Sequence, residues 1–212
     1  MKLHRKIWPW LAGLLALGAL AAGAAWWLIP PYRGNLMEYA AAPRICDRQG
    51  RLLRVVLDRN DFLSEPIPLA QSGDWAVKAL LAGEDKRFYW HGGVDYCAVG
   101  RAAWYNLRAG RVVSGASTIS MLVGKLTEPR PRNLWTKLVE IRHAWELEAR
   151  LTKEQLLEQY LNRAPFGGNL VGLEAAAWRY FGKSAADLTL SEAALLIGLP
   201  QAPSRLRPDL HP

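Results

Sequence analysis

EDKRFYWHGGVD, residues 84–95, is the most informative stretch of this sequence, because it brings carboxylates, cations, aromatic rings and a glycine pair into one short run. The residues before it, 74–83, have apolar side chains at the spacing of a helix, with Asp74 as its expected N-cap. Glu84 therefore falls at the end of an apolar helix, with aromatic residues behind it that would exclude water. A carboxylate so placed is a candidate general base or acid. The alternative interpretation is a charged, solvated helix end.

The rest of the chain is mostly helical in pattern. A β-hairpin is expected over 44–58, around the turn Asp47-Arg48-Gln49-Gly50. Two S/T-x-x-E/Q capping boxes, at 152–155 and 189–192, mark helix starts. The expected fold class is mainly α with a small β appendage. Helices are expected over 98–109, from 117 or 118 to about 126, and over 133–151, 152–162, 170–181 and 190–200.

The N-terminal segment is predicted to be a membrane anchor. Ile7 to Ile29 carries no charge and has tryptophans at both ends, and its length suits a hydrocarbon core of roughly 30 Å. The basic tail 1–6 predicts a cytoplasmic N-terminus, with the rest of the chain outside the cytoplasmic membrane. A cleaved signal peptide is the alternative, because the small residues 21–25 could be processed. A linker over 30–43 follows, and the domain begins at 44.

The charge of the chain limits the classes of molecule that it is expected to bind, and its two cysteines allow two states. The 212 residues carry a net charge of +8 and a pI near 9.7, spread along the chain, which suits an anionic partner such as a phospholipid surface or a pyrophosphate. An exported domain makes nucleic acid an unsuitable partner. Cys46 and Cys97 could form a disulfide in an oxidising compartment, or could be two buried thiols.

A second carboxylate, Glu140, lies on the helix expected over 133–151. At 100° per residue it falls on the margin of the apolar stripe and should be half-buried, whereas Glu146 should point away into solvent. Lys137, one turn earlier, could hold Glu140 ionised. A salt-bridged bystander is the alternative role for such a glutamate. The expected stripe consists of Leu134, Leu138, Ile141 and Trp145.

Between the two glutamates lie a glycine-containing loop and a group of cations. The loop 114–119 opens a helix and could receive phosphate oxygens, although caps of this composition are common. We found no metal-ligand spacing of Cys and His, no nucleotide-binding loop and no nucleophile elbow in the sequence. Two glutamates with basic groups between them fit a pyrophosphate leaving group. The cations are Lys125, Arg130, Arg132 and Lys137.

Taken in order, these segments resemble the peptidoglycan glycosyltransferase domain of the bifunctional class A penicillin-binding proteins, and residues 162–168 most resemble its 1C branch. The resemblance implies a lysozyme-like, mainly helical domain from 44 to 212, C-terminally incomplete, on one transmembrane helix. The blocks that carry it are EDKRFYWHGGVD at 84–95, GRAAWYNLRAG at 100–110, GASTIS at 115–120, KLVEIRHAWELE at 137–148, EQYLNRAPFGG at 158–168 and RYFGKSAADLTLSEAALLIGLPQAPSRLRP at 179–208.

The resemblance also implies roles. Glu84 corresponds to the general base that deprotonates the 4-hydroxyl of the GlcNAc of lipid II, so that this oxygen displaces undecaprenyl pyrophosphate from the growing lipid-linked glycan with inversion. Glu140 corresponds to the second acidic residue, on the pyrophosphate side. No cofactor is required, and a divalent metal ion at the pyrophosphate is allowed. Substrate-binding positions are Lys125, Arg132, Lys137, Ser117, Thr118, Asp85 and His91, and Phe88 also shapes the cleft.

Two positions depart from the family pattern. Leu122 stands where a glutamine is usual, and Thr136 where an arginine is usual. One lost hydrogen bond to a charged group costs about 1.5–3 kcal/mol, a rate factor of roughly 10 to 150. We therefore expect an impaired or retuned enzyme, and not an inactive one. The alternatives are a non-catalytic scaffold that binds glycan or lipid II, and a lysozyme-like glycan hydrolase.

Overall fold

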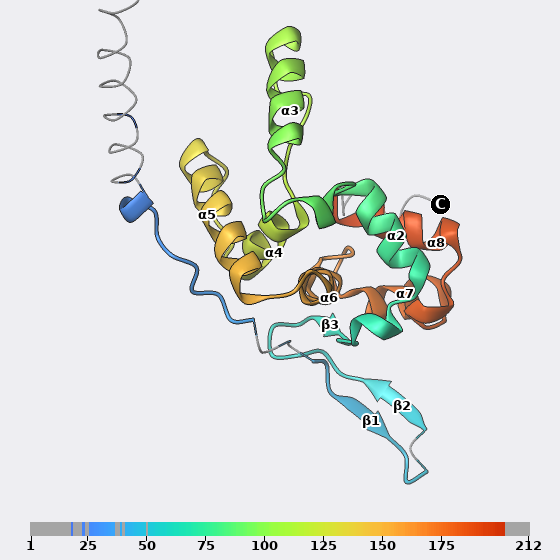
Figure 1. Ribbon diagram of the computed structural model, residues 1–212. Coiled ribbons are helices and arrows are strands. Elements are labelled where there is room, and N and C mark those ends of the chain that lie inside the picture. Colours follow the sequence, from blue (N-terminus) through green and yellow to red (C-terminus); the bar gives the residue numbers. More distant parts are fainter. Residues whose placement is uncertain are drawn as a thin grey trace, which may run out of the picture.

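The computed structural model describes residues 18, 23, 26–36, 39, 41–49 and 51–201. Helices make up most of that part of the chain, and strands are few and short, as the sequence predicts (Figure 1). The helices are α2 (Asp74–Gly83), α3 (Tyr96–Ala109), α4 (Ile119–Thr127), α5 (Leu134–Arg150), α6 (Lys153–Arg163), α7 (Leu173–Phe181) and α8 (Leu190–Gly198), with 3-10 turns η1 (Leu69–Gln71), η2 (Phe88–Trp90), η3 (Ala185–Asp187) and η4 (Leu199–Gln201). The strands are β1 (Arg44–Cys46), β2 (Leu52–Val55), β3 (Leu63–Ser64) and β4 (Leu170–Val171).

Helix starts follow the capping signals of the sequence in most cases. Both capping boxes form, at Thr152 for α6 and at Thr189 for α8. Thr118 caps α4, since its hydroxyl accepts from the amide of Met121. The prediction for α2 is wrong by one residue: Gly73 is the N-cap at φ 75°, and Asp74 is the first helical residue.

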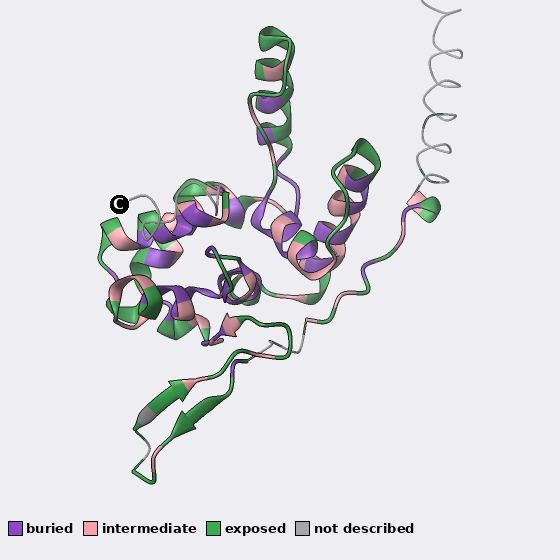
Figure 2. Cartoon of the chain, turned by 180° about the vertical axis from the view of Figure 1, so that it is seen from behind, coloured by how far each residue is buried: buried purple, intermediate pink, exposed green. Residues whose placement is uncertain are grey.

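The core lies where α4 and α6 meet their neighbours. α4 packs against α5 and α6, and α2 packs against α8. Figure 2 shows buried residues concentrated on these helices, while the β1–β2 hairpin is mostly exposed. Large side chains that are fully buried in this core include Leu80, Ile119, Leu147, Leu156, Leu161 and Phe166.

Only part of the expected apolar stripe of α5 is packed: Ile141 and Trp145 lie against a small buried cluster, whereas the other two members are exposed. Leu134 is 89% exposed and Leu138 is 48% exposed. Tertiary contacts override the pattern, because Gly124 of α4 lets that helix approach α5 so closely that a Cβ there would lie 3.3 Å from His143 Cβ. The buried residues of α5 are Thr136, Val139, His143, Ala144 and Leu147.

The β elements confirm one prediction and correct another. β1 and β2 pair antiparallel as the expected hairpin, with a bulge between Ile45 and Cys46. The helix expected from Leu170 begins instead at Leu173, because Leu170–Val171 forms the short strand β4, parallel to β3. Gly172, at φ 90°, makes the turn from strand to helix. Cys46 and Cys97 are both free and exposed, so neither the disulfide nor the pair of buried thiols is present.

The tail 1–6 and most of the anchor expected over 7–29 lie outside the described residues. Of that run the structure describes 18, 23 and 26–29. None of the described helices has the length and apolar character needed to cross a membrane.

The chain that leaves residue 26 is fastened along α5. Arg142 donates to the carbonyl oxygens of Trp26, at 2.6 Å, and of Ile29, and its guanidinium lies 4.6 Å from the centre of the Trp26 ring. Glu146 accepts from Arg142 Nε at 2.8 Å and from the backbone N–H of Tyr32 at 2.7 Å. Glu146 therefore does not face solvent, contrary to the prediction, because the segment that runs from residue 26 to Tyr32 covers it.

Candidate active site

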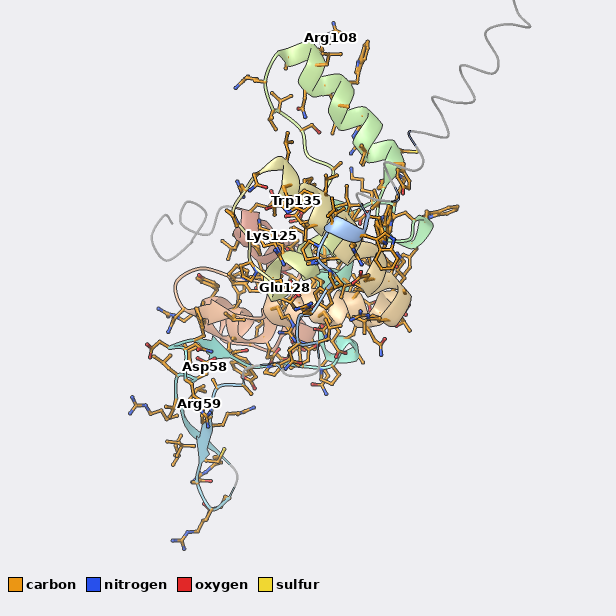
Figure 3. All side chains as sticks on the ribbon, turned by 90° about the vertical axis from the view of Figure 1, so that its left-hand side faces the viewer. Asp58, Arg59, Arg108, Lys125, Glu128 and Trp135 are labelled. Atoms are coloured by element: carbon orange, nitrogen blue, oxygen red, sulfur yellow. The ribbon has the colours of Figure 1, made fainter. Side chains whose placement is uncertain are left out.

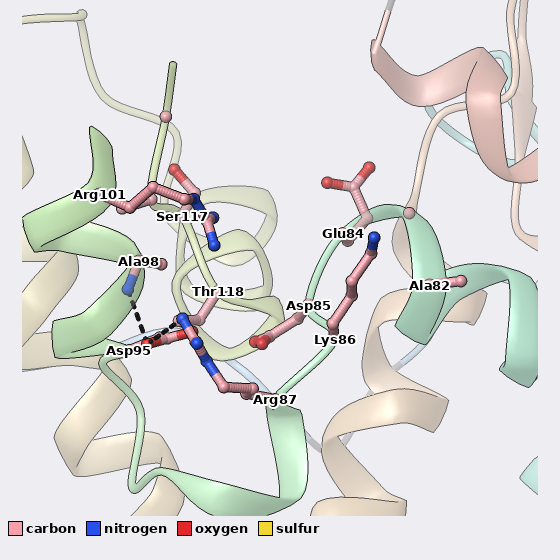
Figure 4. A pocket seen from close by; sticks show the side chains of 13 residues that line it. Ala82, Glu84, Asp85, Lys86, Arg87, Asp95, Ala98, Arg101, Ser117 and Thr118 are labelled. Carbon is pink, nitrogen blue, oxygen red and sulfur yellow. Dashed lines mark hydrogen bonds and ion pairs between the residues drawn. The ribbon is translucent and has the colours of Figure 1, made fainter. Parts of the chain in front are cut away.

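Glu84 is the residue directly after α2, at the mouth of a hollow of about 260 Å³. Its carboxylate is half-buried and accepts from Gln201 Nε2 at 3.1 Å. In Figure 4 the Glu84 side chain projects from the end of α2, across the hollow from Ser117 and Arg101. The aromatic residues that follow do not cover it as expected, since Tyr89 and Trp90 are 53% and 87% exposed.

The rest of the segment 84–95, which we call the Glu84 loop, is fastened to the start of α4. Asp85 is 5% exposed and accepts from the backbone N–H of Ile119 at 3.1 Å. His91 Nε2 lies 3.1 and 3.0 Å from the two carboxylate oxygens of Asp85. The Thr118 hydroxyl donates to Gly93 O at 2.6 Å. These contacts fix the backbone that carries Glu84.

Gly93 also needs to be glycine. Its φ is 98°, and a Cβ there would lie 2.9 Å from backbone atoms of Ala144 in α5. Arg87 also stabilises the loop, because it donates two hydrogen bonds to the Asp95 carboxylate, at 2.9 and 3.0 Å. Burial alone would raise the pKa of the Asp95 carboxyl, but the hydrogen bonds from Arg87 and from the Ala98 amide hold that pKa below its usual value.

Glu140 lies in a second hollow, of about 250 Å³, on the α5 side. Its carboxylate receives a 2.8 Å hydrogen bond from Lys137 Nζ, and the same Nζ is 2.8 Å from Ser117 Oγ. The Glu140 side chain is 17% exposed, so the half-buried position predicted from the helical face is confirmed. Lys137 thereby links the second glutamate to the loop before α4.

The four predicted cations line this second hollow. Arg130 is paired with Glu128 at 3.1 Å. Lys125 and Arg132 form no ion pair with any of the described residues, and Lys125 is exposed. They therefore present uncompensated positive charge to whatever occupies the hollow. The cationic members of its lining are Lys125, Arg130, Arg132 and Lys137.

The two hollows belong to one cleft. A third hollow, of about 380 Å³, is lined by Glu84 together with Lys125 and Arg132. Ser117 lines all three. The structure therefore brings together every predicted site residue except Phe88 and His91, two members of the Glu84 loop that line none of these hollows.

The two departures from the family pattern both lie along the cleft. Leu122 is half-buried and lines two of the hollows. Thr136 is 7% exposed, and its hydroxyl donates to Pro131 O at 2.7 Å. Thr136 therefore closes the turn that carries Arg132, at the start of α5.

Sequence reasoning did not identify three residues of the cleft. Gln201 reaches Glu84 from the far end of the chain, and Arg101 lines the first hollow from α3. Tyr160 lies beside Glu84, and its pKa is well above the usual value because of burial and, second, the Glu84 carboxylate. Tyr160 is therefore a neutral phenol in the cleft wall. Only the folded chain joins these residues, so local sequence held no signal for them.

The residues at the cationic end do not fit a metal ion held by protein ligands. Among the described residues, no three His, Cys, Asp or Glu side chains are grouped closely enough to hold one. The lining there offers one carboxylate, Glu140, which is already paired with Lys137, beside three further cations. Anionic oxygens are the ligands that this end of the cleft suits.

The described part of the chain is mainly helical, and its cleft places two glutamates beside a cationic wall that suits an anionic group. The chain belongs to the transglycosylase family, whose model matches residues 49–212. It is 42% identical over 210 residues to penicillin-binding protein 1C of Escherichia coli (strain K12), an alignment that covers 98% of this chain and 27% of the relative.

Two further relatives are similar over most of the chain. Penicillin-binding protein 1A of Aquifex aeolicus (strain VF5) is 37% identical over 202 residues, covering 92% of this chain and 27% of the relative. Penicillin-binding protein 1F of Bacillus subtilis (strain 168) is 38% identical over 173 residues, covering 81% and 24%. The chain thus spans about a quarter of the length of these relatives.

Proposed function

We propose that this chain is a peptidoglycan glycosyltransferase of cell wall biogenesis, which polymerises lipid II into glycan strands and releases undecaprenyl pyrophosphate. The observation that carries the proposal is the single cleft that holds Glu84 at one end and Glu140 with its cations at the other. Membership of the transglycosylase family supports it. We infer a lysozyme-like helical fold for the domain.

In the proposed reaction Glu84 takes the proton from the 4-hydroxyl of the acceptor GlcNAc. The freed oxygen forms a bond to the anomeric carbon of the donor as the bond from that carbon to the pyrophosphate oxygen breaks, which inverts the configuration. The electron pair of the broken bond leaves with the pyrophosphate. Lys125 and Arg132, which have no ion-pair partner among the described residues, neutralise that charge.

Glu140 acts in this scheme through Lys137. Its carboxylate holds the Lys137 ammonium group at 2.8 Å, and that group in turn lies 2.8 Å from Ser117 Oγ across the cleft. The ammonium is thereby oriented before the leaving group arrives, which avoids reorganisation during the reaction. Glu140 is therefore the residue that prepares the pyrophosphate side of the site.

An apolar surface beside the cleft supports a lipid-linked substrate at a membrane. The exposed large side chains of α3 and of the start of α5 include Trp104 at 62%, Leu107 at 79% and Leu134 at 89%. Three parts of the structure extend to the same side of the domain in Figure 1: α3, the start of α5, and the residue-26 end of the segment 26–36. Figure 3 shows Arg108 at the far end of α3, with Trp135 on the same side. We infer that this side lies on the outer face of the cytoplasmic membrane.

Two other functions remain as outcomes of the test. A non-catalytic scaffold that binds lipid II or glycan would explain Leu122, whereas a glycan hydrolase leaves the cationic wall without a role. Incubation of the chain with labelled lipid II separates the three. Polymer is expected; cleavage of pre-formed glycan would indicate a hydrolase, and binding without turnover would indicate a scaffold.

We expect the segment 7–29 to stay attached as a single transmembrane anchor, because the uncharged run with tryptophans at both ends is longer than a signal-peptide core. Mass spectrometry of the protein from membranes should find an intact N-terminus. A mature chain that begins near Ala25 would show that the segment is a cleaved signal.

Leu122→Gln should raise turnover on lipid II about 10-fold, the worth of one restored hydrogen bond of about 1.4 kcal/mol. Leu122 lines the cleft between Glu84 and Glu140, where an amide could reach the substrate. The side chain also packs partly against the core, so a small fall in melting temperature should accompany the gain. Initial rates of polymer formation measure the effect, and a rate no faster than that of the parent would remove this residue from the substrate contacts.

A further inference from the structure

A second set of contacts, made by residues of α5 and α6, holds the Glu84 loop, and none of its members lines the cleft hollows. Lys153, the first residue of α6, donates to His91 O at 2.7 Å and to Glu148 Oε1 at 2.7 Å. Its Nζ also lies 4.3 Å from the centre of the Phe88 ring. Glu148 accepts in addition from the hydroxyl of Ser120 at 2.6 Å.

These groups are removed from water. The Lys153 and Glu148 side chains are 19% and 11% exposed, and Phe88 is 1% exposed. An ion pair so placed is weak evidence for stability, because desolvation offsets much of its attraction. Its geometry matters more, since a lysine held at three points fixes the backbone oxygen that it binds.

We propose that the Lys153–Glu148 pair positions the Glu84 carboxylate for its reaction, an inference that rests on the proposed function. Lys153 fixes the backbone of His91 through the bond to His91 O. The His91 ring lies 3.0 Å from the Asp85 carboxylate, and Asp85 is the residue next to Glu84. Glu148 keeps Lys153 in place and anchors it to α4 through Ser120. The pair acts through the loop and does not touch the substrate.

Lys153→Met, which keeps most of the apolar stem over Phe88 and removes the ammonium, should lower kcat about 10- to 100-fold, because a displacement near 1 Å can cost about 10²-fold. KM should stay within about 2-fold, because the cations of the cleft are untouched. Lys153→Arg should restore kcat to within about 3-fold, since a guanidinium can donate to both His91 O and Glu148.

The double variant Lys153→Met with Glu148→Gln separates loop positioning from the penalty of an unpaired buried charge. It leaves no such charge, so it should fold, yet it still lacks the bond to His91 O and should show the same loss of kcat. Lys183→Met is the matched control, because Lys183 pairs with Glu192 at 2.7 Å away from the Glu84 loop. The control should keep both kcat and KM.

Amide hydrogen exchange supplies a readout that does not depend on turnover. In the double variant, exchange within 85–91 should be faster than in the parent, with little change in α7 and α8. A folded double variant with parental kcat, or with parental exchange in the loop, would overturn the proposal. So would a double variant that fails to fold, because the pair would then stabilise the whole domain. If the unsubstituted chain makes no polymer, the proposed function is overturned. The hydrogen-exchange comparison then still tests whether the Lys153–Glu148 pair holds the loop.

Discussion

Glu84→Gln should abolish polymerisation of lipid II, with a fall in rate of about 10²- to 10⁴-fold, the usual cost of removing a general base. The substitution keeps the size of the side chain and an oxygen that can still accept from Gln201, which lies 3.1 Å from the carboxylate. It removes only the capacity to take a proton. The fold and the binding of lipid II should therefore be preserved.

The measurement is the initial rate of polymer formation from labelled lipid II, with binding to the same substrate and the melting temperature followed in parallel. Glu154→Gln is the matched control, since Glu154 is exposed on α6 and lines none of the cleft hollows. A Glu84→Gln variant that keeps more than about a tenth of the parental rate would remove Glu84 from the role of base.

Local signals predicted the elements, because capping is a short-range property. The capping boxes at Thr152 and Thr189 and the cap at Thr118 lie within three residues of the amides that they bind. The buried face of α5 was only partly predicted, for the opposite reason. Its burial depends on how closely Gly124 of α4 approaches it and on the segment that begins at residue 26, and both contacts arise only in the folded chain.

The difference between short-range signals and contacts made only in the folded chain also explains which site residues could be predicted. Glu84 and Glu140 are candidates from the sequence because carboxylates on helix ends and margins are visible there, with the cations close to them along the chain, and their catalytic roles stay predictions. The sequence could not show which residue His91 contacts within its loop, and the structure shows that this partner is Asp85. Gln201 lies far from Glu84 in sequence, so it could not be associated with Glu84 before the chain was folded.

Glu140→Gln should lower kcat about 10- to 150-fold, the worth of one hydrogen bond to a charged group. The amide would no longer hold the Lys137 ammonium by charge, so its orientation toward Ser117 and the leaving pyrophosphate would loosen. The melting temperature should change little, because Lys137 is 40% exposed and can find water instead. Steady-state kinetics on lipid II, beside the Glu154→Gln control, measures this loss.

Glu146→Gln provides the contrast, six residues further along the same helix. Burial alone would raise the pKa of the Glu146 carboxyl, but hydrogen bonds from Arg142 and from the Tyr32 amide lower that pKa below its usual value. The ionised form is thus favoured by folding. Its contribution to stability is present above the unfolded pKa and is lost as pH falls through the folded pKa.

The Glu146→Gln variant should therefore melt about 3–12 °C lower at neutral pH, the equivalent of about 1.5–3 kcal/mol, and the difference should shrink in acid. Its kcat per folded molecule should stay near the parental value, since Glu146 contacts the backbone of Tyr32 and lines none of the cleft hollows. The two variants should thus separate cleanly, with Glu140 affecting rate and Glu146 affecting stability. Equal losses of kcat at both positions would mean that α5 supports catalysis as a rigid whole and that the Glu140 carboxylate has no special part in it.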